Sequence, residues 1–152
     1  MIERAYLTAA QALSYASARA LNGFEGHQSE AVQGALLRAS DEIDASFVFS
    51  GRLVSIGQSR AWPRVGARDQ YGHEISGIPE AIRRGVVELA IAYLTSEADA
   101  EILLGQRGHI QREKIGDIAV SYQNSPASRR ARLHHLLQPL LLPAGHTRIT
   151  RT

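Results

Sequence analysis

Ala61-Trp62-Pro63-Arg64, followed by a second X-Pro step at Ile78-Pro79, is the stretch of sequence that decides the fold. It contains the only Trp of the chain and, together with Pro79, two of its five Pro residues. A proline pushes the residue before it away from helical geometry, so each step interrupts a helix. We therefore predict a loop of fixed shape that separates two helices.

The residues before this loop have the pattern of two helices. Thr8 and Gln11 have the spacing of a capping box, and the Ala-rich sequence that follows predicts a helix to about Leu21, where Asn22-Gly23 ends it. A second helix is predicted from about Ser29. Its apolar residues recur at helical spacing along one face. They are Val32, Ala35, Leu36, Ala39, Ile43 and Phe47.

The loop spans about Phe49 to Ile78 and is too long for a simple connector. Apolar residues along it predict that the loop folds back on the helices and is ordered. They are Trp62, Val65, Tyr71, Ile75 and Ile78. Pro79 suits the first turn of a third helix, which is predicted to run to about Ser96. Because that helix is apolar on most of its circumference, we expect it to be the central one.

The C-terminal third is predicted to contain a hairpin, a last helix and an arm. Alternating apolar residues over 118–122 predict a short strand, which could pair with residues 112–115. A last helix is predicted from about Ser128, and Pro139 would kink or end it. Its apolar residues are Leu133, Leu136, Leu137 and Leu140. Residues 144–152 lack a core pattern, and we expect them to form an extended arm that binds a neighbouring chain.

A chain of 152 residues is long enough to form one domain with a buried core. We predict a mainly α fold: a small bundle of about four helices with a long ordered loop, a short β-strand or hairpin and an extended C-terminal arm. The domain would span 1–143 and the arm 144–152. The chain has no Cys, which excludes disulfides and thiolate metal sites. No segment approaches the ~18 apolar residues of a membrane span, so we expect no membrane partner.

The motifs of common catalytic and metal sites are missing from the sequence. His73-Glu74 lacks the second His, four residues on, that a zinc-protease helix requires. His134 and His135 are adjacent and cannot share a metal from one helix face. Glu42 and Asp44 are interpreted as exposed helix charges and not as an acid/base pair. We expect no enzymatic activity, no cofactor and no bound metal.

The basic residues are nearly all Arg and leave two kinds of partner open. The chain has 17 basic and 15 acidic residues, and only Lys114 among the basic ones is not Arg. Arg favours fixed contacts to phosphates or carboxylates, so basic clusters could contact DNA or an acidic protein surface. The densest run consists of Arg129, Arg130 and Arg132. Single-strand binders also need aromatic platforms, and this run has no exposed aromatic residue nearby.

Short motifs over nearly the whole chain carry a resemblance to one family. Besides the loop, they include Tyr6-Leu7-Thr8, Ile43-Asp44, Phe49-Ser50-Gly51-Arg52, Glu88-Leu89-Ala90, Glu113-Lys114-Ile115-Gly116 and Leu136-Leu137-Gln138-Pro139-Leu140. The chain resembles tailed-phage proteins labelled DnaT-like single-stranded-DNA-binding proteins. Those proteins are similar in layout to phage head-tail connector (adaptor) proteins.

The resemblance implies a structural head-tail connector of a tailed bacteriophage, made in the host cytoplasm and placed in the neck of the virion. Such proteins form a homo-oligomeric ring of about twelve copies under the portal protein. The ring extends the DNA channel, where it contacts DNA without sequence specificity, and docks tail-completion (stopper) proteins. The alternative is a DnaT-like, single-stranded-DNA-binding accessory protein of replication.

The connector reading assigns roles to two groups of residues. Arg148, Ile149 and Arg151, in the arm, would contact the portal protein. Trp62 and Arg64 would brace the loop or a subunit interface. For Trp62, internal packing is the other reading, since a large apolar ring in a long loop also serves to anchor that loop.

Overall fold

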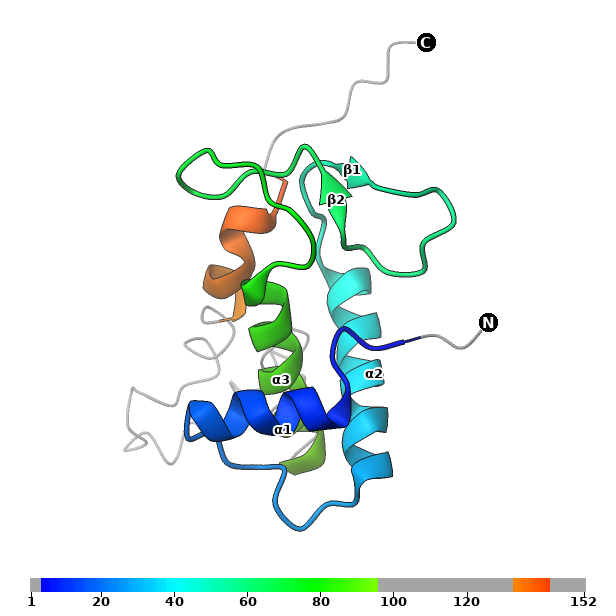
Figure 1. The fold of residues 1–152 in the computed structure, drawn as a ribbon, viewed down its shortest axis with the longest axis vertical. Helices are drawn as coiled ribbons and strands as arrows, with labels where there is room; N and C mark the ends of the chain where they lie inside the picture. Colours follow the sequence, from blue (N-terminus) through cyan, green and yellow to red (C-terminus); the bar gives the residue numbers. More distant parts are fainter. Residues whose placement is uncertain (1–3, 96–132, 143–152) are drawn as a thin grey trace, which may run out of the picture.

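The computed structural model describes residues 4–95 and 133–142 of the chain. This part contains three α-helices, α1 (Ala9–Ala18), α2 (Ser29–Ser46) and α3 (Glu80–Thr95). Between α2 and α3 lies a two-stranded sheet of β1 (Arg52–Leu53) and β2 (Arg64–Val65). Residues 133–137 are helical and continue into a 3-10 helix, η3 (Gln138–Leu140). The predicted mainly α fold is confirmed (Figure 1). The expected hairpin over 112–122, the arm and the 143/144 boundary lie outside the described residues.

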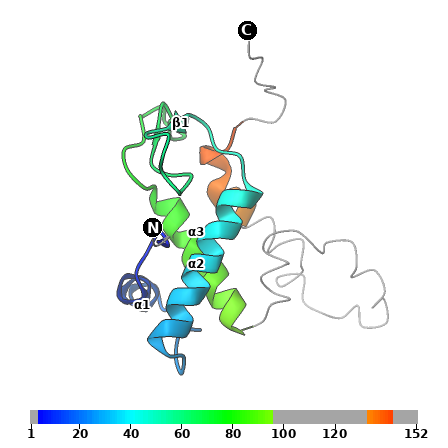
Figure 2. The same ribbon diagram turned by 90° about the vertical axis from the view of Figure 1, so that its right-hand side faces the viewer.

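The helices α2 and α3 lie side by side along the long axis of the molecule, and α1 crosses them near one end (Figures 1 and 2). The loop between α2 and α3, which carries β1 and β2, covers the opposite end (Figures 1 and 2). The segment 133–140 closes the bundle beside the start of α3. The loop is therefore held at one end of the molecule, away from α1.

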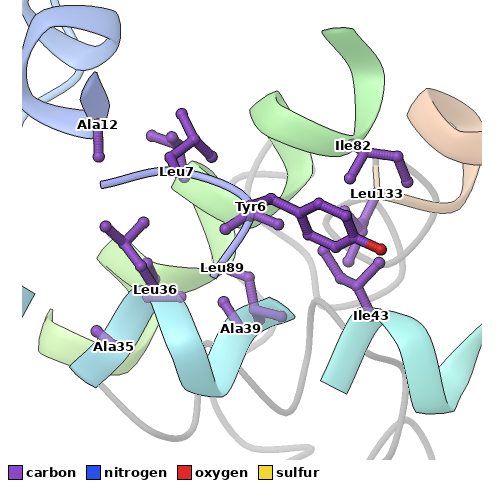
Figure 3. Close-up of a cluster of buried hydrophobic side chains, with 14 of the residues drawn as sticks. Tyr6, Leu7, Ala12, Ala35, Leu36, Ala39, Ile43, Ile82, Leu89 and Leu133 are labelled. Atoms are coloured by element: carbon purple, nitrogen blue, oxygen red, sulfur yellow. The ribbon is translucent and has the colours of Figure 1, made fainter. Parts of the chain in front are cut away.

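The core forms between α2 and α3, and the residues before α1 and the segment 133–137 complete it (Figure 3). The predicted apolar face of α2 is buried, except that Phe47 lies at the end of the helix and is half-buried. On α3, Gly85 lies where a Cβ would be 3.3 Å from Leu133 Cδ1 and 3.4 Å from Ile43 Cδ1. The absence of a side chain at Gly85 lets three segments approach closely.

The C-terminal segment is tied to the start of the loop. The amide of Ser50 donates to the carbonyl of Leu140 at 2.9 Å, and the amide of Leu142 donates to that of Val48 at 2.9 Å. Pro139 lies in η3, which confirms that the regular α-helix ends before it. Of the apolar residues predicted for this helix, Leu133, Leu137 and Leu140 are buried.

The helix α1 begins as predicted and ends earlier than predicted. The Thr8 hydroxyl accepts from the Gln11 amide at 3.2 Å, and the Gln11 side chain accepts from the Thr8 amide at 2.9 Å, so the capping box is present. The helix ends at Ala18 because Ala20 adopts a left-handed backbone with φ of 51°. The amide of Leu21 then donates to the Ala16 carbonyl at 2.9 Å, and that of Ala20 to the Ser17 carbonyl at 3.2 Å. These bonds form a Schellman motif, in which glycine is the usual left-handed residue.

Replacing this alanine by glycine is expected to stabilise the protein. Ala20 is exposed, so the Ala20→Gly change removes left-handed strain without loss of packing. The free energy of unfolding should rise by about 1 kcal/mol. Chemical denaturation followed by circular dichroism would measure this change. The matched control is Ala18→Gly, inside the last turn of α1, which should lower the free energy of unfolding by about 0.5–1 kcal/mol. Equal losses in both variants would contradict this account.

Candidate nucleic-acid interface

A polar network centred on Asp44 fixes the loop to the helices. The Tyr6 hydroxyl donates to Asp44 Oδ1 at 2.6 Å, and it accepts from the Trp62 amide at 3.2 Å. The other carboxylate oxygen, Oδ2, accepts from Arg60 Nη1 and from the Ala61 amide, each at 3.2 Å. The Asp44 side chain is only 16% exposed, so its interpretation as an exposed helix charge was wrong. The returning loop covers this end of α2, which the sequence pattern of α2 alone does not reveal.

Tyr6 acts in this network as a neutral donor. Burial and the hydrogen bond to Asp44 raise the pKa of the Tyr6 phenol well above its usual range. Its amide donates to the hydroxyl of Ser40 at 3.1 Å, and that hydroxyl donates to the Leu36 carbonyl at 2.8 Å. The N-terminal segment is thereby attached to α2 at two points.

Arg60 is occupied by acidic and backbone groups of the protein itself. Besides its bond to Asp44, its Nη2 lies 2.7 Å from Asp41 Oδ1, and its Nε donates to the Arg4 carbonyl at 2.7 Å. The Arg60 side chain is 12% exposed. Arg60 therefore has a structural role in the loop and is not available to a partner.

The structure places both loop residues that the sequence analysis selected at the root of the hairpin. The Trp62 ring is 1% exposed and packs edge-on against Phe49, with the ring centroids 5.6 Å apart. Arg64 donates to the backbone carbonyls of Ser50, Gly51 and Ala61 at 2.7, 3.0 and 3.2 Å. These contacts pack Trp62 internally and let Arg64 brace the loop. A role for either residue at a subunit interface stays a prediction.

The strands β1 and β2 form a hairpin that the sequence analysis did not predict. They pair antiparallel, with Arg52 opposite Val65 and Leu53 opposite Arg64. Gly51 has a φ of 77°, and a Cβ there would lie 2.6 Å from the Val65 carbonyl oxygen, so the approach of the strands requires glycine. An open pocket of about 640 Å³ lies at this hairpin, bordered by Arg side chains and aliphatic side chains.

A second tight turn, over residues 67–75, carries exposed aromatic rings. Asp69 Oδ1 accepts from the amides of Tyr71 and His73, both at 2.9 Å, and the Asp69 amide donates to the His73 carbonyl at 2.9 Å. Backbone hydrogen bonds from His73 and Tyr71 hold the pKa of Asp69 below its usual value. Arg68 Nη1 donates to the Gly72 carbonyl at 2.7 Å. The turn is thus fixed by its own polar groups.

The prediction that Tyr71 folds the loop back onto the helices was wrong. The Tyr71 side chain is 75% exposed, and its ring centroid lies 6.4 Å from that of His73. Gly72 reverses the chain with a φ of 84°, and the Asp69 contacts hold the turn away from the core. Arg68 is exposed in the same turn, where it donates to the Gly72 carbonyl, and it forms no ion pair with any described residue. An aromatic ring next to a cation is the combination that single-strand binding requires.

The other predicted contact residues cannot be placed in this arrangement. Arg129, Arg130 and Arg132 lie outside the described residues, as do Arg148, Ile149 and Arg151. None of the helices in the described part of the chain combines the length and apolar content that a membrane span requires. Residues 4–95 and 133–142 also contain no group of three or more His, Cys, Asp or Glu side chains that could bind a metal ion.

Comparison with known proteins assigns the chain to a family. Residues 4–152 match the model of the family described as "Putative DnaT-like ssDNA binding protein". The chain belongs to this DnaT-like family. No curated protein and no solved structure gives a significant match.

The family assignment corrects the sequence analysis on function. The match to this family favours single-stranded DNA as the partner. Binding of single-stranded DNA was the alternative that the sequence analysis gave to the connector function. The description of the chain as a phage virion component, a connector bound to portal and tail proteins, was wrong, because the family whose model matches is the DnaT-like family. The motifs that carried the resemblance are also motifs of the fold, such as Ile43-Asp44 and Phe49-Ser50-Gly51-Arg52, so they do not report an assembly. The location of the protein stays a prediction.

Removing the Tyr6 hydroxyl is expected to destabilise the DnaT-like protein. In Tyr6→Phe, the Asp44 carboxylate and the Trp62 amide each lose a partner in a poorly hydrated place. The free energy of unfolding should fall by about 1–3 kcal/mol, measured by urea denaturation. Tyr71→Phe is the matched control, since that exposed hydroxyl has no hydrogen bond to a described residue, and it should leave stability unchanged. A Tyr6→Phe protein as stable as the control would show that the network contributes nothing.

Proposed function

We propose that this chain is an accessory protein of DNA replication that binds single-stranded DNA and acts by binding, without catalysis. The observation that carries the proposal is the exposed Tyr71 ring on a turn that Asp69 holds and that also contains the exposed Arg68. The family to which the chain belongs supports the same partner.

The turn offers a platform on which an unpaired base can stack. Every base has a flat π face, so stacking on Tyr71 would be tolerant of sequence. Asp69 fixes the backbone at Tyr71 and at His73, and this order exists before DNA arrives. A pre-ordered site loses less conformational entropy on binding, which favours affinity. Paired bases are not available for stacking in this way, so the proposal implies a preference for single strands over duplexes.

Phosphate contacts would come from Arg side chains. Arg68 uses one of its nitrogens on the Gly72 carbonyl, and a guanidinium has five N–H donors, so others remain for a phosphate. Arg52, on β1, is exposed and forms no ion pair with a described residue. The run of Arg129, Arg130 and Arg132 stays a predicted further contact.

Loss of the Tyr71 ring should weaken binding of single-stranded DNA. Stacking on one aromatic ring contributes about 1–3 kcal/mol, so Tyr71→Ala is expected to raise the Kd for labelled oligo(dT) about 5- to 150-fold. Fluorescence anisotropy at fixed salt would measure this change, and a duplex of the same length is the second ligand. Tyr71→Phe keeps the stacking face and should bind as the unchanged chain does. If Tyr71→Ala and Tyr71→Phe bind equally well, the turn is not the DNA site.

Contacts of Arg129, Arg130 and Arg132 with phosphates would make the affinity for single-stranded DNA depend on the salt concentration. Each phosphate contact to a single strand contributes about 0.7 to the slope of log affinity against log salt. Replacing Arg129, Arg130 and Arg132 together by Ala should therefore reduce this slope by about 2. Arg83→Ala, which removes an exposed cation from α3, is the control and should leave the slope unchanged. An unchanged slope in the triple variant would exclude the run from the interface and leave the Tyr71 platform unaffected.

A further inference from the structure

The pocket at the β1–β2 hairpin differs chemically from the Tyr71 turn. Its volume is about 640 Å³, and its lining includes Arg52, Arg60, Arg64, Leu53, Ile56 and Asp44. The lining contains aliphatic side chains and cations, and no aromatic ring. The two features thus present different surfaces to a partner.

The aliphatic side chains of the hairpin are exposed within a short stretch. Leu53, Val54 and Ile56 are 40%, 55% and 102% exposed, respectively. The loop that connects β1 and β2 is stabilised by polar contacts of Gln58 and not by these aliphatic side chains. Gln58 Oε1 accepts from the Ser55 amide at 2.9 Å, and Nε2 donates to the carbonyls of Arg60 and Pro63, both at 2.9 Å. The hairpin therefore presents a preformed apolar surface to water.

The charge at this pocket is positive. Arg60 is matched by Asp41 and Asp44, so it contributes little to the field outside. Arg64 donates to three backbone carbonyls at the same hairpin. Arg52 is exposed and forms no ion pair with a described residue. The pocket thus combines the exposed cation of Arg52 with an aliphatic wall.

We propose that this pocket binds a short acidic and apolar segment of a partner protein. An aliphatic side chain of the segment would cover Leu53 and Ile56, and an adjacent carboxylate would bond to Arg52, whose planar guanidinium suits carboxylates. Single-stranded DNA fits the lining less well, because bases stack best on aromatic rings and those lie on the Tyr71 turn. This site would let the chain hold a protein and a DNA strand at the same time.

The test uses the full chain and a fluorescein-labelled hexapeptide of alternating Asp and Leu, followed by fluorescence anisotropy. Ile56→Ser and Arg52→Gln should each raise the Kd of the peptide about tenfold. Val48→Ser and Arg83→Gln are the matched controls, since Val48 is 69% exposed and Arg83 is exposed, and neither lines the pocket. Both controls should bind as the unchanged chain does. Peptides with Asn for Asp, or with Ser for Leu, should bind more weakly.

Several outcomes would overturn this proposal. They are absence of peptide binding to the unchanged chain, equal effects of Val48→Ser and Ile56→Ser, and displacement of the peptide by oligo(dT) together with weaker DNA binding in Ile56→Ser. The last result would assign the pocket to DNA. The proposal does not rest on the DNA platform, because Tyr71→Ala should leave the peptide Kd unchanged whether or not that variant loses DNA binding.

Discussion

The arrangement of the loop depends on the solvation of one carboxylate. Asp44 is largely withdrawn from water, and a charge in such a place destabilises the fold unless donors surround it. Its donors come from the N-terminal segment, through Tyr6, and from the loop, through Arg60 and the Ala61 backbone. The Asp44 side chain of α2 thus fixes the positions of the N-terminal segment and of the loop. The hairpin and the Tyr71 turn are both parts of the loop that it fixes.

The molecule separates the groups that stabilise it from the groups that it presents to partners. The aliphatic core lies between α2 and α3, and the rings of Trp62 and Phe49 anchor the loop to it. The side chains at the two loop tips, Tyr71 and Ile56, contribute little to that core. Substitutions of the side chains at the loop tips can therefore alter partner binding with small effects on folding. Binding residues commonly lie on loops that a rigid scaffold positions.

The sequence predicted the features that depend on local pattern. The capping box at Thr8, the start of α2 and the apolar faces of α2 and the last helix follow from periodicity and from neighbouring residues. The burial of Asp44, the exposure of Tyr71 and the hairpin of β1 and β2 depend on contacts across the fold, so no local pattern reports them. For the same reason, the sequence did not distinguish the paired Arg60 from the exposed Arg68 of the same loop. In the structure Arg60 is paired with Asp41 and Asp44, and Arg68 is exposed.

The bonds between the start of the loop and the C-terminal segment have a consequence for the order of folding. Ser50 and Leu140, whose amide and carbonyl form one of these bonds, are 90 residues apart in sequence. During synthesis the helices α1, α2 and α3 emerge well before this partner does, so the root of the loop is completed last. Long-range contacts of this kind slow folding, because the closure entropy is lost before the contact forms.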